Sequence, residues 1–183
     1  MAHQYTEKTV ATKEIFSGKI IKVQVDQVEL PNGSIHTREL VKHPGAVGII
    51  AITNEGKLVL VDQFRKPLER GLLEIPAGKL EPGEAPISTG IRELEEETGL
   101  VADQVEPYCS FYTSPGFADE MIHLFVARGL KKKENPASAD EDELIDVVEV
   151  SLTDALKLIA DGQICDAKTI IAVQYLQLLA KVC

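Results

Sequence analysis

Five glutamates lie close together in one stretch of the chain, and their carboxylates are the groups best suited to chemistry. They are Glu84, Glu93, Glu95, Glu96 and Glu97. Carboxylates at this density are typical either of a solvated helix, where Glu is a good helix former, or of a site that binds cations. The run of glutamates alone favours the solvated helix. Glycines and an arginine at fixed distances around the run favour the cation site, because a solvated helix requires none of them.

The residues from Pro86 to Thr98 are predicted to form the helix that carries four of these glutamates. Proline suits the first turn of a helix, and Gly99 suits its C-terminal exit. Apolar residues recur along this segment at the spacing i, i+4, i+7, which predicts a buried stripe on one side of the helix. The stripe consists of Ile87, Ile91 and Leu94.

Three glutamates are predicted to share the face roughly opposite that stripe, because successive helical residues are about 100° apart. They are Glu93, Glu96 and Glu97. Like charges one turn apart destabilise a helix by roughly 0.2–0.5 kcal/mol per pair. Bound divalent cations would reverse that effect, and Mg²⁺ prefers hard oxygen ligands of this kind.

The stretch GKLEPGEAPISTGIRELEEETGL, from Gly78 to Leu100, matches the Nudix box at every specified position. That pattern is G-x5-E-x7-R-E-U-x-E-E-x-G-U, where U is an apolar residue. The chain therefore resembles the Nudix hydrolases. The resemblance implies an α/β fold, with helices on both sides of a mixed sheet in an α/β/α sandwich. It also implies hydrolysis of a nucleoside diphosphate linked to another group, with two or three Mg²⁺ ions, or Mn²⁺, in each site.

The resemblance further implies roles for single residues of the box. The metal ligands would be the three glutamates of the helix face, joined by the carbonyl oxygen of Ala77. Arg92 would orient the glutamates, and Glu84 would tether the preceding loop to the helix. We expect Glu97→Gln to lower turnover by orders of magnitude with little loss of folding, because an exposed ligand contributes little to stability.

Hydrolysis of a pyrophosphate requires help because its oxygens and the attacking water are both electron-rich. Divalent cations would neutralise the phosphate oxygens and lower the pKa of that water. A carboxylate base within one hydrogen bond of the water would contribute about 10²–10⁴-fold. The box supplies carboxylates for the cations, so the base has to come from elsewhere in the chain.

The segment after the box is similar to that of the ADP-ribose pyrophosphatases within the family. Pro115 stands sixteen residues after Gly99, in a Ser-Pro-Gly turn that continues to Gly116. The resemblance implies that this turn lies in the substrate site. It implies the same for four residues nearer the N-terminus, two of them arginines suited to adenine and phosphate. These are Phe16, Arg38, Glu39 and Arg65.

The same resemblance places the general base on a glutamate in the loop before the last strand. Glu141 is our first candidate for the base, and Glu143 would be a further metal ligand. Glu120, close to the Ser-Pro-Gly turn, is the competing candidate for the base. The loop itself, from Lys131 to Glu143, reads by composition alone as a solvated segment.

Two domains are predicted. Residues 1–44 read as a small antiparallel sheet with a Pro-Asn-Gly turn, and residues 45–183 as the Nudix domain. By analogy with the subgroup, the first domain is exchanged between the two subunits of a homodimer. The later elements are read as strands around 46–53, 57–64, 72–75, 108–113, 121–127 and 145–150. A helix opened by Ser151 and Asp154 and a final helix over 170–182 complete the chain.

Composition narrows the possible partners. The net charge of −10 disfavours binding to nucleic acid or to a membrane surface, which usually needs a basic face. The three cysteines form no C-x-x-C pair, so we expect reduced thiols in a cytoplasmic protein. The N-terminus has no apolar signal-like run.

Two other interpretations remain open. A Nudix box defines a mechanism rather than a substrate, so another nucleoside diphosphate sugar or an oxidised nucleotide is an alternative to ADP-ribose. The second alternative is that the chain is a noncatalytic module that senses ADP-ribose, although such a module does not need three metal-binding glutamates.

Overall fold

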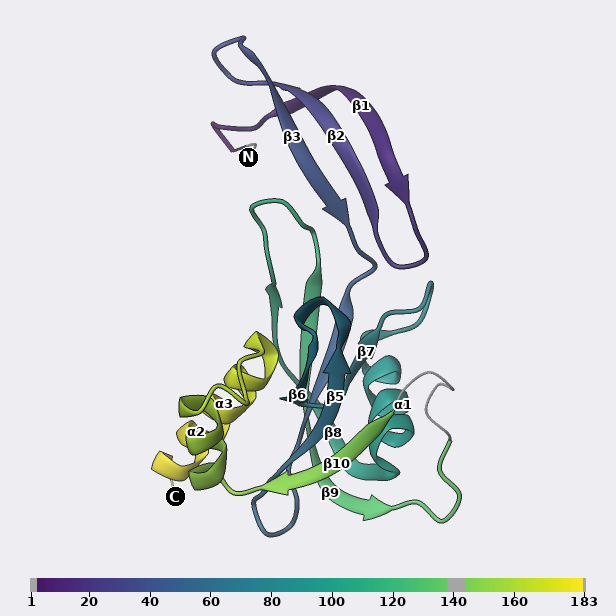
Figure 1. Cartoon of the computed structure of the whole chain (residues 1–183), viewed down its shortest axis with the longest axis vertical. Coiled ribbons are helices and arrows are strands. Elements are labelled where there is room, and N and C mark those ends of the chain that lie inside the picture. The colour runs from purple at the N-terminus through teal and green to yellow at the C-terminus, as the bar shows by residue number, and fades with distance from the viewer. Residues whose placement is uncertain (1–2, 138–143, 183) are drawn as a thin grey trace. The chain divides into compact units, whose positions relative to one another are not determined.

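A computed structural model of the protein describes residues 3–137 and 144–182 (Figure 1). The chain divides into two compact units. The first contains Met1–Gly45 together with Tyr112–Met121, and the second contains Ala46–Phe111 together with Ile122–Cys183. The segment between two strands of the second unit therefore belongs with the N-terminal residues.

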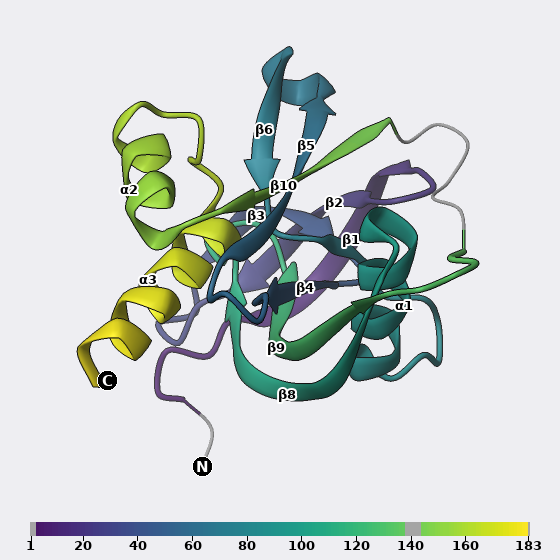
Figure 2. The same ribbon diagram turned by 90° about the horizontal axis from the view of Figure 1, so that it is seen from below.

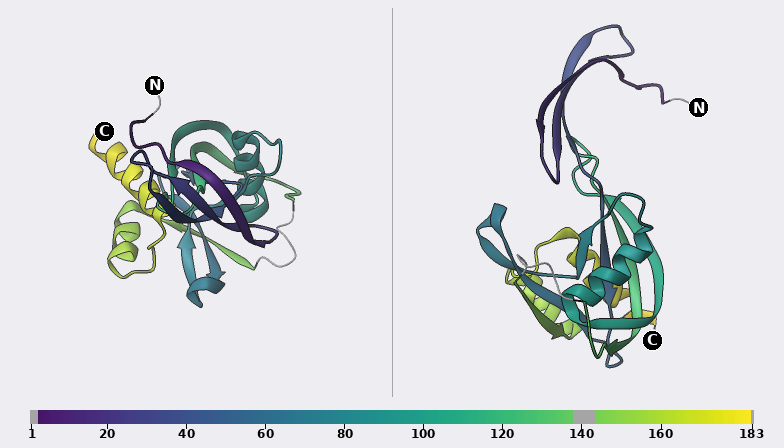
Figure 3. Two further views of the ribbon diagram at one scale, coloured as in Figure 1. Left: turned by 90° about the horizontal axis from the view of Figure 1, so that it is seen from above. Right: turned by 90° about the vertical axis from the view of Figure 1, so that its right-hand side faces the viewer.

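The first unit is built on a three-stranded antiparallel sheet, which Figure 3 shows as a curved sheet. Its strands are β1 (Lys8–Ser17), β2 (Lys22–Glu29) and β3 (Ile35–Lys42). Every residue of β1 is exposed. The segment Tyr112–Met121 is fastened to the end of β3, because the N–H of Val41 donates to the carbonyl oxygen of Phe117 over 2.8 Å. The carboxylate of Asp119 also accepts from the Lys42 ammonium, over 2.9 Å.

Two sheets form the centre of the second unit. A mixed sheet has the order β7-β4-β9-β8, in which β4 is antiparallel to β7 and parallel to β9. An antiparallel sheet has the order β10-β5-β6. The strands are β4 (Ala46–Ala51), β5 (Leu58–Arg65), β6 (Arg70–Glu74), β7 (Ala77–Lys79), β8 (Leu100–Tyr112), β9 (Met121–Lys132) and β10 (Ile145–Val150), with a short 3₁₀ helix, η1 (Lys66–Leu68), between β5 and β6.

Helices lie on both sides of these sheets (Figure 2). They are α1 (Pro86–Thr98), α2 (Leu152–Ala160) and α3 (Ala167–Val182). One buried apolar cluster, which includes Leu94, packs beneath α1, and a larger one, which includes Val173, packs beneath α2 and α3. Within the described part of the chain, none of the helices has the length and apolar character needed to span a bilayer.

The predicted bounds of α1 are confirmed, and its exit is made by Gly99 in the left-handed conformation, with φ 67°. The predicted apolar stripe is wrong. Leu94 is buried, but Ile87 and Ile91 are 38% and 44% exposed. The helix instead packs through Gly90, whose missing side chain leaves space that Ile49 of β4 fills. The buried face is consequently rotated toward the glutamates.

Other boundaries differ from those predicted. β8 begins eight residues before the predicted start, because its many exposed polar residues hide the strand. β9 continues to Lys132, into the segment expected to be a loop. α3 begins three residues earlier, where Asp166 accepts from the N–H of Thr169 as a helix-capping residue does. The cap of α2 is as expected, since the Ser151 hydroxyl accepts from the N–H of Asp154.

Candidate metal-binding and catalytic site

Two glutamates of α1, Glu93 and Glu97, lie against the short strand β7, which Figure 1 shows beside the helix. Glu97 is only 7% exposed, and its Oε2 accepts a hydrogen bond of 2.9 Å from the N–H of Ala77. Our expectation that Glu97 is exposed is therefore wrong. The rotation of the buried face explains the error, because Gly90 and Leu94 turn Glu97 toward β4 and β7.

Glu93 lies directly over Gly78. A Cβ atom added to Gly78 would meet Oε1 of Glu93 at 1.8 Å and its Cδ at 1.9 Å. No ordinary side chain fits there while the carboxylate keeps its place. Gly78 is thus needed for space rather than for an unusual backbone angle, and it forms a cradle for one of the proposed metal ligands.

Arg92 connects the carboxylates on its side of the helix. Its Nη1 lies 2.7 Å from Oε2 of Glu96 and 2.9 Å from Oε1 of Glu93, and its Nη2 lies 3.4 Å from Oε2 of Glu84. Desolvation opposes the charge of Arg92, but these hydrogen bonds and charges outweigh it and raise the pKa of Arg92 above its usual value. The Nε atom is buried without a hydrogen-bond partner among the described residues. Arg92 therefore holds together several anions, and its position depends on all of them.

Glu84 links the loop before α1 to the helix. Its Oε2 accepts from the Thr89 hydroxyl over 2.8 Å and contacts Arg92. The bond from Thr89 is the main cause that lowers the pKa of Glu84. The remaining acidic residue of the run, Glu95, points elsewhere and pairs with Lys133 at 2.7 Å.

The donor set on this side of α1 fits a hard divalent cation. Carboxylate oxygens and a backbone carbonyl are the ligands that Mg²⁺ accepts, and the cradle at Gly78 brings Glu93 beside the Ala77 segment. In the arrangement described, Arg92 supplies the positive charge next to Glu93 and Glu96. No three His, Cys, Asp or Glu side chains within residues 3–137 and 144–182 converge as a ready-made metal group.

Arg65, at the end of β5, forms a two-pronged ion pair with Glu74, at the end of β6. Nε and Nη2 of Arg65 donate to the two carboxylate oxygens over 2.6 and 2.8 Å. Lys168 donates to the same carboxylate from α3. Burial opposes the charge of Glu74, but the bond from Arg65 and the charge of Lys168 outweigh it and lower the pKa of Glu74. Sequence reasoning did not single out Glu74 or Lys168, because they lie 94 residues apart.

The other substrate-site candidates belong to the first unit. Arg38 forms two hydrogen bonds with Glu7, of 2.9 and 2.6 Å, and is half-buried. Glu120 accepts from the Thr113 hydroxyl over 2.7 Å and lies 3.6 Å from His43. The remaining candidates are exposed, namely Phe16, Glu39, Pro115 and Gly116. The candidates Glu141 and Glu143 lie outside the described residues.

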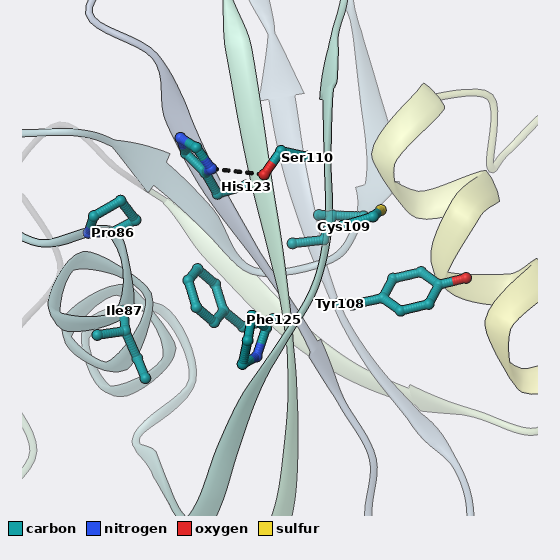
Figure 4. Close-up of a pocket in the computed structure, with 9 residues that line it drawn as sticks. Pro86, Ile87, Tyr108, Cys109, Ser110, His123 and Phe125 are labelled. Carbon is teal, nitrogen blue, oxygen red and sulfur yellow. Dashed lines mark hydrogen bonds between the residues drawn. The ribbon is translucent and has the colours of Figure 1, made fainter.

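A pocket of about 400 Å³ opens on the second unit between the start of α1 and strands β8 and β9 (Figure 4). Its wall is largely apolar and includes Ile87 and Phe125, with Ser110 and His123 hydrogen-bonded over 2.7 Å at one side. None of the box glutamates lines it. This pocket is therefore separate from the carboxylates of α1.

Comparisons with known proteins identify the family to which the chain belongs. Residues 42–172 match the NUDIX domain, and residues 7–41 match the nucleoside diphosphate sugar hydrolase N-terminal domain. The chain is 61% identical to a methanol dehydrogenase activator from Bacillus methanolicus over 178 residues, covering 97% of this chain and 96% of the relative. It is 58% identical to an ADP-ribose pyrophosphatase from Bacillus subtilis (strain 168) over 172 residues, covering 94% and 93%.

A crystal structure of an ADP compounds hydrolase has the same fold, with a TM-score of 0.84 and 20% identity, and the match covers 99% of this chain and 97% of that one. The chain therefore belongs to the NUDIX domain family and is a Nudix-type hydrolase. The α/β fold with a mixed sheet and the resemblance to ADP-ribose pyrophosphatases are both confirmed.

Proposed function

We propose that this protein hydrolyses the diphosphate of ADP-ribose, giving AMP and ribose 5-phosphate. The observation that carries the proposal is the placement of Glu93 and Glu97 of α1 against Gly78 and Ala77. Similarity to an ADP-ribose pyrophosphatase at 58% identity over nearly the whole chain supports the substrate.

Mg²⁺, or Mn²⁺ in its place, is the proposed cofactor, with two or three ions per site. The ligands would be Glu93, Glu96, Glu97 and the carbonyl oxygen of Ala77, with Glu143 as a further ligand. When bound, these cations would neutralise the phosphate oxygens and lower the pKa of the attacking water. Arg92 and Glu84 keep the carboxylates in place through the contacts described above.

The chain's other residues bind and orient the substrate. Arg65 and Arg38 present guanidinium groups for the diphosphate and the adenine, and Phe16 is proposed to stack on the base. Glu39 and the turn at Pro115 and Gly116 would complete the substrate site. Glu141 is proposed as the base that takes a proton from water, with Glu120 as the other candidate.

We further propose a homodimer in which residues 1–44 pack against the partner. Large apolar side chains stand exposed on the first unit, Val10, Ile15 and Phe16 among them, which supports such a contact. The free thiols of Cys109 and Cys165 support a cytoplasmic location. The dimer is tested by the mass of the chain in solution and by its loss when residues 1–44 are deleted.

The substrate is tested by incubating the purified chain with Mg²⁺ and a panel of diphosphates in ¹⁸O-labelled water. The panel contains ADP-ribose, a GDP-sugar, a UDP-sugar and an oxidised nucleotide. ADP-ribose should be turned over fastest, and one product should carry one ¹⁸O atom. If another compound is turned over faster, that compound is the preferred substrate and the proposal of ADP-ribose is wrong. Tight binding of ADP-ribose without turnover would favour a sensing module.

A second candidate function is activation of a dehydrogenase. It is favoured by the 61% identity to a protein named methanol dehydrogenase activator. The test is the activity of a methanol dehydrogenase with and without this chain. If activation occurs with the wild type and disappears with Glu97→Gln, it depends on hydrolysis. If Glu97→Gln still activates, the two functions are separate.

A further inference from the structure

Four charged side chains meet where β5, β6 and the start of α3 come together. Glu74 is 3% exposed and Lys168 is 7% exposed, so this contact is deep within the second unit. Lys168 donates to Oε2 of Glu74, and its Nζ also lies 3.1 Å from Oδ2 of Asp166. Arg65 completes the cluster through its two bonds to Glu74. Two cations and two anions leave the cluster without net charge.

Stability alone does not explain this cluster. A buried ion pair is often no more stable than a well-packed apolar pair of the same volume. Lys168 also stands in the first turn of α3, where the helix dipole disfavours a positive charge. A side chain that goes against both rules is expected to have a role other than folding.

The cluster fixes the orientation of the Arg65 guanidinium. Glu74 takes Nε and Nη2 of the guanidinium, and among the hydrogen bonds of the described residues none uses Nη1. The side chain is 37% exposed, so its far edge faces outward while its near edge is fixed. A guanidinium held in this way is oriented in advance for a second anion, because a planar fork bonds two partners along different edges.

The segment that carries Glu74 leads directly into the box. Ile75 donates its N–H to the Thr169 hydroxyl over 2.9 Å, and Ala77 donates its N–H to Glu97 over 2.9 Å. The hydrogen bonds to Glu74 are the main cause that raises the pKa of Arg65, and the charge of Glu97 adds to this effect. Glu74, which bonds Arg65, therefore stands three residues before Ala77, whose N–H bonds the proposed metal ligand Glu97.

We propose that Lys168 is a positioning residue of the phosphate site, which acts through Glu74 to hold the guanidinium of Arg65 toward the substrate. This inference rests on the proposed function, because it takes a diphosphate to be the anion that Arg65 binds. Without Lys168 the cluster carries one net negative charge beside the place where an anionic substrate binds. Glu74 also loses the hydrogen bond that Lys168 donates to its carboxylate.

The test compares Lys168→Met with Lys168→Arg in steady-state hydrolysis of ADP-ribose with Mg²⁺. Lys168→Met should raise KM by roughly tenfold or more, the effect of losing one charge-assisted hydrogen bond to phosphate, with a smaller change in kcat. Lys168→Arg keeps the charge and should stay within about threefold of the wild-type KM. The affinity for Mn²⁺ alone, measured by titration, should be unchanged in both variants.

Two further variants keep the test decisive. Val173→Ala removes buried packing from the same helix, at a residue with 0% exposure that is not part of the cluster, so it should lower stability and leave KM unchanged. The double variant Glu74→Met with Lys168→Met removes the two most deeply buried charges of the cluster together, so it should fold even if Lys168→Met alone does not. The double variant should raise KM by about as much as Arg65→Met, a variant that removes the guanidinium itself.

The results separate the inference from the function on which it rests. If the wild type does not hydrolyse ADP-ribose, the proposed function fails. If it does, and both Lys168→Met and the double variant have a wild-type KM, the positioning role is overturned. A rise in KM for Val173→Ala equal to that for Lys168→Met would also overturn it, because general loosening of α3 would then be the cause.

Discussion

Gly78→Ala should remove Glu93 from the proposed metal site while leaving the fold intact. The added Cβ would lie 1.8 Å from Oε1 of Glu93, whereas ordinary contacts begin at 3.4 Å, so the carboxylate must withdraw by about 1.6 Å. Metal–oxygen distances in a Mg²⁺ site are held near 2.0–2.1 Å, so a ligand displaced this far no longer binds. The glutamate tip is flexible, and the cost to stability should therefore be small.

The magnitude follows from the loss of one ligand. Disturbing even the groups that support metal ligands lowers affinity or activity by about 10–100-fold, so losing Glu93 should lower Mn²⁺ affinity at least tenfold. The assay is a titration with Mn²⁺, paired with thermal unfolding. Gly56→Ala is the control, since its Cβ would meet nothing within 4 Å but its backbone has φ +78°. It should lose about 1 kcal/mol of stability and keep its metal affinity. Wild-type Mn²⁺ affinity in Gly78→Ala would refute the assignment of Glu93.

Three other outcomes are expected. Glu97→Gln should lower kcat by orders of magnitude, whereas Glu95→Gln, on the same helix but paired with Lys133, should retain most of it. Stability of Glu97→Gln should fall only slightly, since an amide oxygen still accepts from the N–H of Ala77. Glu84→Gln should lower kcat about tenfold, because Arg92 loses a charged partner, and unchanged kcat would count against the tether. The pKa of Glu74 is lowered on folding, so its contribution to stability is present above its ordinary value of 4.5 and is lost as pH falls through the folded pKa. The unfolding free energy of Glu74→Gln, from denaturant titrations at several pH values, should therefore decline less below 4.5 than that of the wild type.

The sequence was sufficient for α1 because its ends carry local signals. Pro86 begins the helix and Gly99 ends it in the left-handed conformation, and both effects act within one turn. The face of the helix could not be read in the same way. A hydrophobic pattern counts Ile87 and Ile91 as buried, but the small Gly90 lets β4 approach from another side.

The network around Glu74 could not have been found from one sequence. Its members come from β5, β6 and α3, and only the fold brings them together. The sequence offers no signal for Lys168, because the final helix is predicted from residue 170 and only the structure places Lys168 in its first turn. The early start of β8 was missed because its exposed residues lack the alternation that marks a half-buried strand.

The central claim is that the acidic face of α1 acts with divalent cations to cleave the diphosphate of ADP-ribose. It is tested most directly by removing metals from the purified chain with a chelator and then measuring AMP and ribose 5-phosphate by mass as Mg²⁺ is restored. We predict no products without metal, and equal amounts of both that rise with Mg²⁺ in the wild type but not in Glu97→Gln. Equal product formation with and without metal, or in the two proteins, would contradict the claim.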